Sequence, residues 1–126
     1  MPQNTTLTRT LVVDDELGIC DFLRSFFSRR GYDVRTACSG EDALQVIASF
    51  QPKVILLDIR MQGMSGMEVL ERLHAEHPDC KVIMTTAVAD EGAVERARQL
   101  GAVDYITKPF SLDYLEREVL TKLAEL

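Results

Sequence analysis

The sequence predicts an α/β fold built on a doubly wound, five-stranded parallel sheet, and three observations lead to this prediction. Short apolar runs without polar alternation are typical of strands buried on both faces, as in parallel sheets. The segments between these runs repeat their apolar residues with the 3.6-residue period of a helix. Strands that alternate with helices imply right-handed crossovers, which place helices on both faces of one sheet.

Length and composition place the chain among single-domain proteins. Its 126 residues suit one domain, and 46% hydrophobic with 27% charged residues is ordinary for a soluble globular protein. The net charge of −6 argues against electrostatic binding of nucleic acid. No apolar run approaches the roughly 20 residues that span a bilayer, and the polar N-terminus does not resemble a signal peptide. We therefore expect a cytoplasmic domain over residues 9–126, after a flexible lead-in of residues 1–8.

The first two strands and helices follow from apolar patterns and the residues that interrupt them. Residues 11–13 form an apolar run, and residues 33–37 alternate as an edge strand with one wetter face does. Between them, apolar residues at helical spacing predict a helix that Gly31 ends. These residues are Ile19, Phe22, Leu23, Phe26 and Phe27. Ser39 begins the second helix, and Pro52 prevents its continuation.

The third strand leads to the first candidate functional residue. Residues 54–57 are consecutive apolar residues that run directly into Asp58. An unpaired charge is costly inside a buried strand, but ligands bind at the carboxyl ends of strands in open α/β sheets. Taken alone, Asp58 is better explained as a cap of the following turn. Its functional role therefore depends on the residues that the rest of the chain brings beside it.

The next helix and strand have equally clear signals. Ser65 and Glu68 have the spacing of a capping box, which predicts the start of a helix. Residues 81–84 form an apolar strand that leads into Thr85 and Thr86. This strand therefore ends in hydroxyl groups, where the third strand ends in a carboxylate.

The last part of the chain repeats the alternation of helix and strand. Asp90 is predicted to cap a helix that Gly101 ends. Residues 104–107 form a short strand that leads directly to Lys108. Ser111 then begins a final amphipathic helix, which completes five strands and five helices. The residues on its expected apolar face are Leu112, Leu115, Val119, Leu120 and Leu123.

Polar side chains follow four of the five predicted strands. They are Asp14 and Asp15 after the first, Asp58 after the third, Thr86 after the fourth and Lys108 after the fifth. Because the carboxyl ends of parallel strands share one edge, these groups are expected to face one crevice. Clustered carboxylates repel one another unless a cation binds, and Mg²⁺ prefers such oxygen ligands. A lysine and a hydroxyl nearby suit a phosphoryl group, which an aspartate can accept as a nucleophile.

In this arrangement the chain resembles the response regulator receiver domain of two-component signalling, over residues 9 to about 125. The matching pieces are Asp14-Asp15 after Leu-Val-Val, Asp58 after Val-Ile-Leu-Leu, Thr86-Ala87, and Lys108-Pro109-Phe110 with Tyr105 three residues before Lys108. Periodicity alone leaves two common strand orders open. The resemblance implies the order 2-1-3-4-5 of a flavodoxin-like, chemotaxis-regulator-like three-layer sandwich.

The resemblance also implies a metal site and a phosphorylation site. Asp58 would accept the phosphoryl group and would be a ligand of Mg²⁺, for which Mn²⁺ could substitute. Asp15 would bind the ion directly, and Asp14 would place it through water. The backbone carbonyl of Arg60 would be a further ligand.

The remaining matched residues would respond to the phosphoryl group. Lys108 would pair with it, and the Lys108-Pro109 peptide bond would be cis. Thr86 would donate a hydrogen bond to it, although Thr85 competes for this role because adjacent strand residues point to opposite faces. The small residue that follows favours Thr86. Tyr105 would be the aromatic residue of the switch, or else it covers the core on a short edge strand.

Two residues depart from the family pattern in the loop after Asp58. Gln62 stands where the family usually has proline, which removes the stiffening of a fixed φ angle. Ser65 replaces an aspartate but remains a good N-cap residue. The side chain of Arg60, a bulky cation beside the site, is expected to influence the lifetime of the phosphoryl group.

The expected function is therefore a phosphorylation-dependent signalling switch that assists only its own phosphorylation and dephosphorylation. Its partner would be a sensor histidine kinase or a phosphotransfer protein, with a possible phosphorylation-dependent homodimer through the last two helices, and neither nucleic acid nor membrane. One alternative is a pseudo-receiver that docks without being phosphorylated. Another is a Mg²⁺-dependent phosphatase, although such enzymes usually need a second acid where this chain has Arg60. A flavodoxin-like cofactor binder lacks its phosphate-cradling loop after the first strand.

Overall fold

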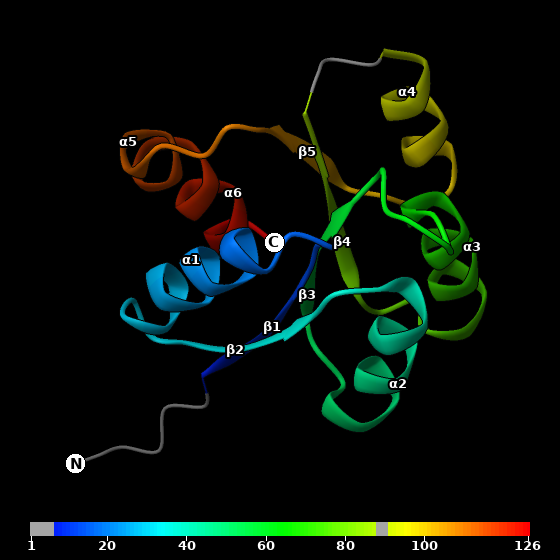
Figure 1. Ribbon diagram of the computed structural model, residues 1–126, viewed down its shortest axis with the longest axis horizontal. Helices are drawn as coiled ribbons and strands as arrows, with labels where there is room; N and C mark the ends of the chain where they lie inside the picture. The colour runs from blue at the N-terminus through cyan, green and yellow to red at the C-terminus, as the bar shows by residue number, and fades with distance from the viewer. Residues whose placement is uncertain (1–6, 88–90) are drawn as a thin grey trace.

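The computed structural model describes residues 7–87 and 91–126 and forms a three-layer α/β sandwich around a five-stranded parallel sheet (Figure 1). The strand order is β2-β1-β3-β4-β5, which confirms the expected 2-1-3-4-5 arrangement. Most of the expected lead-in and the predicted helix cap Asp90 lie outside the described residues. Among the residues described, no helix is both long and apolar enough to cross a membrane.

The strands differ in burial as their places in the sheet require. They are β1 (Thr8–Val13), β2 (Tyr32–Ala37), β3 (Val54–Asp58), β4 (Lys81–Thr86) and β5 (Asp104–Thr107). Every residue of β3, the central strand, is buried, whereas β2 at the edge alternates between buried or half-buried and exposed residues. The alternation in the sequence therefore identified the edge strand, and the unbroken apolar run identified the centre.

Helices cover both faces of the sheet (Figure 1). They are α1 (Leu17–Ser28), α2 (Gly40–Phe50), α3 (Gly66–Glu76), α4 (Glu91–Gln99), α5 (Leu112–Tyr114), η1 (Leu115–Val119) and α6 (Leu120–Ala124). The apolar side chains of α1, η1 and α6 form one core cluster with one face of the sheet. Those of α2, α3 and α4 form a second cluster with the opposite face.

Three of the predicted caps form as the sequence indicates. The side chain of Ser111 accepts a hydrogen bond from the N–H of Tyr114 at the start of α5. The Ser39 side chain accepts a hydrogen bond from the N–H of Asp42 at the start of α2. At the start of α3, Ser65 and Glu68 form the complete capping box. Helix α2 ends with Gln51 in a left-handed conformation, directly before Pro52.

The last helix differs from the single α-helix that the sequence predicts, because a π-helical turn, η1, separates α5 from α6. The buried residues Leu115, Val119 and Leu123 are spaced four residues apart, which exceeds the 3.6-residue turn of an α-helix. A π-helical turn joins residues i and i+5 and so contains more residues. All three side chains lie on the face that packs against the sheet.

Two apolar residues that helical periodicity placed on buried faces are exposed. Phe22 of α1 is 38% exposed and Leu112 of α5 is 55% exposed. The buried face of α1 instead includes Cys20, whose thiol donates a hydrogen bond to the backbone carbonyl of Asp14. A small residue is needed there because the loop after β1 lies directly against the helix.

We expect Phe27→Ala to lower the free energy of unfolding by about 3–5 kcal/mol, because it removes a fully buried aromatic ring. Phe22→Ala on the same helix provides the matched control, and we expect it to cost less than about 1 kcal/mol. Urea denaturation of both variants checks this expectation. Equal losses would show that the two faces of α1 are assigned wrongly.

Candidate functional site

The register of the sheet brings four strand ends to one edge. Val13 pairs with Leu57 across β1 and β3, so Asp14 and Asp58 both follow a paired position. Asp58 itself pairs with Thr85 of β4. Strand β5 is in register with β4, so Lys108 follows it at the same edge. The polar groups predicted from the sequence therefore converge because parallel strands end together.

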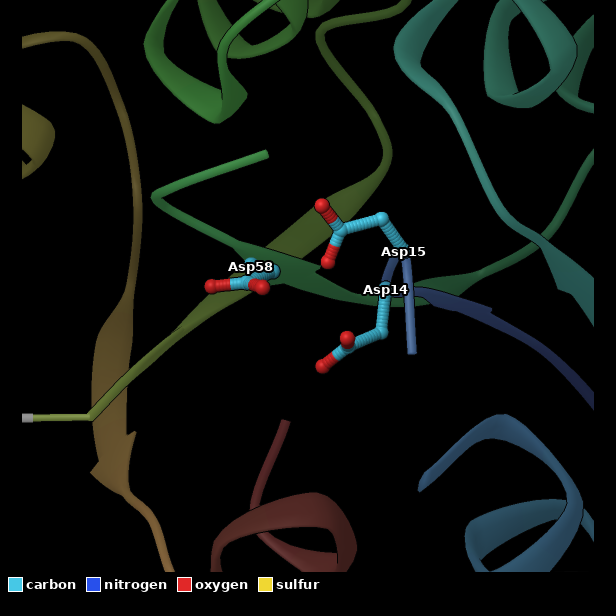
Figure 2. A group of neighbouring side chains, drawn as sticks. All are labelled: Asp14, Asp15 and Asp58. Carbon is cyan, nitrogen blue, oxygen red and sulfur yellow. The ribbon is translucent and has the colours of Figure 1, made fainter. Parts of the chain in front are cut away.

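Three carboxylates gather at this edge. Oxygen atoms of Asp14, Asp15 and Asp58 all lie within 4.8 Å of one another, at the ends of β1 and β3 (Figure 2). Asp14 and Asp58 are buried, with exposed fractions of 2% and 5%, whereas Asp15 is exposed. No other group of three His, Cys, Asp or Glu residues comes this close within the described part of the chain.

Lys108 places its ammonium group between the two buried carboxylates. Its Nζ lies 2.7 Å from Oδ2 of Asp14 and 3.2 Å from Oδ2 of Asp58. Glu16 is a third acidic neighbour, at 3.9 Å. Only 12% of the Lys108 side chain is exposed, so these contacts form with little screening by water.

Backbone N–H groups fix the orientation of each carboxylate. Asp14 accepts a hydrogen bond from the N–H of Glu16 at 2.9 Å, and Asp58 accepts one from the N–H of Arg60 at 3.2 Å. Both hydrogen bonds form Asx turns, in which an aspartate side chain accepts a bond from the backbone N–H of the residue two positions later. Asp15 accepts its bond from the N–H of Gln62 at 3.2 Å. The first of these loops and the loop after Asp58 are thereby tied together.

Burial and neighbouring charges shift the pKa values of both Asp58 and Lys108. Burial, and then the negative charge of Asp14, raise the pKa of Asp58, and the nearby Lys108 offsets this only in part. Burial alone would lower the pKa of Lys108, but the hydrogen bonds and charges of Asp14 and Asp58 raise it overall. Lys108 is therefore firmly charged, while the ionised form of Asp58 is disfavoured.

The donor set fits a divalent cation. Three carboxylates and one ammonium group leave two negative charges uncompensated when all four groups are ionised. Oxygen ligands from carboxylates suit Mg²⁺, which keeps several waters and rarely takes more than one or two protein carboxylates directly. Asp14 and Asp58 already share the ammonium group of Lys108, so the exposed Asp15 is the carboxylate best placed to meet a metal ion from solvent.

The threonines and the tyrosine approach the site in different ways. Because Asp58 pairs with Thr85, those two side chains point to the same face of the sheet, and Thr86 points to the other. The backbone carbonyl of Thr86 accepts a hydrogen bond from the N–H of Lys108 at 2.8 Å. Tyr105 is half-buried, and the guanidinium carbon of Arg98 lies 5.9 Å from its ring centroid. The Lys108-Pro109 peptide bond is cis.

Some contributors to the site were not singled out by the sequence analysis. Gly66 packs so closely that a Cβ on it would overlap the carbonyl oxygen of Asp58. Glu16 and the N–H of Gln62 contact Lys108 and Asp15. No local pattern marks these three roles, because they depend on how separate segments of the chain meet at this edge of the sheet.

Comparison with known proteins agrees with this geometry. The family model for the response regulator receiver domain matches residues 10–120. Sporulation initiation phosphotransferase F of Bacillus subtilis (strain 168) is 32% identical over 111 residues, which cover 88% of this chain and 90% of that protein. The chain spans only 24% of Regulatory protein AtoC of Escherichia coli (strain K12), with 37% identity. The solved CheY-like receiver domain protein of Methanospirillum hungatei JF-1 has 32% identity and a TM-score of 0.86, over 95% of this chain and 96% of that one.

We expect Gly66→Ala to lower the free energy of unfolding by at least about 2 kcal/mol, because the added methyl group must displace backbone rather than a flexible side chain. Gly18→Ala is the matched control, since a Cβ at this helical glycine meets nothing within 4 Å. That variant should be slightly more stable than the wild type. Chemical denaturation of both variants decides the matter, and an unchanged Gly66→Ala protein would contradict the close approach.

We expect Asp58→Asn to be more stable than the wild type at neutral pH in metal-free buffer. A raised pKa in the folded state means that the wild type loses stability as the pH rises through it, and asparagine cannot suffer this loss. The advantage should therefore vanish as the pH falls below 3.8, the ordinary pKa of an aspartate. Unfolding curves measured at several pH values test this. Asp21→Asn, at a side chain that is 69% exposed, serves as control. A less stable Asp58→Asn variant at pH 7 would refute the electrostatic account.

Proposed function

The chain belongs to the response regulator receiver domain family, and from this premise we propose that it is a signalling switch phosphorylated on Asp58 by a sensor histidine kinase or a phosphotransfer protein. The observation that carries the proposal is the position of Lys108, whose largely buried ammonium group joins Asp58 to Asp14. This arrangement holds a nucleophilic carboxylate next to a cation that can pair with a phosphoryl group.

In the proposed reaction, a carboxylate oxygen of Asp58 attacks phosphorus while the bond from phosphorus to the donor nitrogen breaks. The phosphoryl group leaves the donor histidine and ends as an acyl phosphate on Asp58. Such transfer depends mainly on positioning and charge neutralisation rather than on covalent work by the protein. Lys108 is positioned to pair with the transferred group, and the N–H of Arg60 keeps the carboxylate oriented.

Mg²⁺, or Mn²⁺ in its place, would neutralise the charge that accumulates on the phosphoryl oxygens. Asp15, Asp58 and the backbone carbonyl of Arg60 would hold the ion, with Asp14 acting through water. The bond from the N–H of Gln62 to Asp15 supports this assignment, because it holds the exposed carboxylate toward the other two. The protein itself assists only its own phosphorylation and dephosphorylation.

The proposed response starts from the hydroxyl group of Thr86, the last residue of β4. Thr86 lies one residue beyond the position that pairs with Asp58, and its side chain is on the same face of the sheet as Tyr105. The hydroxyl group would bond a phosphoryl oxygen, Tyr105 would move into the space that it leaves, and the face of the last two strands and helices would change. A switch from 1:99 to 99:1 needs about 5.5 kcal/mol of differential stabilisation. Hydrogen bonds to a charged group contribute about 1.5–3 kcal/mol each, so two bonds near the top of this range, or three near its middle, supply that amount.

The oligomeric state and the cellular location of the switch are also proposals. The face formed by the last two helices would be the place for a phosphorylation-dependent homodimer, and the domain, from residue 9 onward, would work in the cytoplasm. Output beyond the receiver domain differs among relatives. This chain spans 90% of a phosphotransferase but only 24% of a longer regulatory protein.

Incubation with acetyl phosphate and Mg²⁺ should add one phosphoryl group to the wild-type protein, detectable by intact-protein mass spectrometry. Asp58→Asn should abolish the labelling because it removes the nucleophile. Asp21→Asn should be labelled normally, since that side chain is exposed on α1. A wild-type protein that stays unlabelled, as a pseudo-receiver would, contradicts the proposal.

We expect Thr86→Val to slow phosphorylation by about tenfold or more, because it removes one hydrogen bond to a charged group. Thr85→Val makes the same change of hydroxyl to methyl on a neighbouring residue that is equally buried. Its rate should stay within about twofold of the wild type. Rates of labelling by acetyl phosphate distinguish the two. A slow Thr85→Val variant beside a normal Thr86→Val variant would transfer the role to Thr85.

A further inference from the structure

Strand β5 lies at the edge of the sheet, so one side of its backbone has no neighbouring strand. Consecutive N–H groups in a strand point in opposite directions, and the outward ones need other partners. The N–H of Lys108 points inward and donates to the carbonyl of Thr86 at 2.8 Å. The N–H of Thr107 therefore points outward, and it donates to the hydroxyl oxygen of Tyr114 at 3.1 Å.

Tyr114 is well held in this position. Its own N–H donates to the side chain of Ser111 at 3.0 Å, which fixes it in the first turn of the last helix. Its half-buried ring packs against the apolar cluster on the α1 side of the sheet. The hydroxyl group thus closes a loop of the chain that begins at Thr107 and contains Lys108.

The two hydrogen bonds hold two consecutive peptide groups, those that contain the N–H of Thr107 and the N–H of Lys108. One bond runs inward from Lys108 to β4, and the other runs outward from Thr107 to the last helix. A lysine side chain has several rotatable bonds, so the place of its ammonium group depends on a fixed backbone. That group must lie within bonding distance of Asp14 and Asp58 together.

We propose that Tyr114 is a positioning residue for Lys108, acting through the backbone of Thr107. This inference rests on the proposed function, in which the Lys108 ammonium group pairs with the phosphoryl group on Asp58. Tyr114 touches neither the carboxylates nor the phosphoryl group, and its hydroxyl oxygen holds the end of β5 so that the ammonium group stays at the site. A shift of the ammonium group by a fraction of an ångström is enough to slow phosphoryl transfer, because a misplacement of about 1 Å can cost about 100-fold in rate.

The last helix has a second attachment to β5 that provides a matched control. Nζ of Lys122 lies 2.9 Å from Oδ2 of Asp104, at the opposite end of the strand from Lys108. Lys122→Gln weakens the docking of the helix without changing the bond to Thr107. Tyr114→Phe removes only the hydroxyl group that accepts the Thr107 N–H. The two variants therefore separate helix docking from the position of Lys108.

We expect Tyr114→Phe to slow labelling by acetyl phosphate by about fivefold, the effect of one lost neutral hydrogen bond. The side-chain NMR resonances of Lys108 should shift in this variant even without phosphate. Lys122→Gln should lower the unfolding midpoint while leaving the labelling rate and the Lys108 resonances as in the wild type. Lys108 resonances unchanged in Tyr114→Phe, with a lower midpoint alone, would show a merely structural role and overturn the inference.

Hydrogen exchange in the wild-type protein gives a test that needs no variant. The Thr107 amide should be protected, and fast exchange would show that the Tyr114 bond does not form. If the wild type is not phosphorylated at all, the proposed function fails. The Lys108 resonances of Tyr114→Phe still decide whether Tyr114 positions the lysine, so the two failures are distinguishable.

Discussion

Mutual repulsion among three carboxylates at one sheet edge is the constraint on which the rest of the structure depends. At 4.8 Å, two ionised carboxylates repel each other by about 3.5 kcal/mol at an effective dielectric constant of about 20. Without a cation, Asp14 and Asp58 could not both remain buried and ionised at the ends of β1 and β3. The ammonium group of Lys108 supplies one positive charge between them, and the remaining charge makes the edge receptive to a divalent ion.

Several contacts of the fold fix the positions of the groups at this edge. The buried strand β3 carries Asp58 from the centre of the sheet, and Gly66 allows the following loop to return against its carbonyl. A backbone N–H group binds one oxygen of each carboxylate, and the Oδ2 atoms of Asp14 and Asp58 contact Lys108. On the far side, β5 is fixed by β4 within the sheet and by Tyr114 outside it. Under the proposed function, a phosphoryl group on Asp58 would therefore act on strands and loops that hydrogen bonds already link together.

Much of this arrangement could be predicted from the sequence, because it depends on local signals. Apolar runs, alternation and caps such as Ser65 mark the elements, and polar residues at strand ends predict the cluster. Strand order is not local, so it came from the resemblance to a family. Periodicity also misplaced Phe22, since a stripe of five apolar residues is wider than the buried face of α1. The roles of Gly66 and Tyr114 depend on contacts between segments, which no spacing in the sequence reveals.

The most direct measurement of the central claim is a calorimetric titration of the wild-type protein with Mg²⁺, repeated with Asp15→Asn. Asp15 is exposed and lacks the ammonium contact of the other two carboxylates, so its charge is the part of the cluster that an added ion must compensate. The account predicts saturable binding of one ion per chain and an affinity at least about tenfold weaker in the variant, which should remain folded. Absence of saturable binding in the wild type, or equal affinities in both proteins, would contradict it.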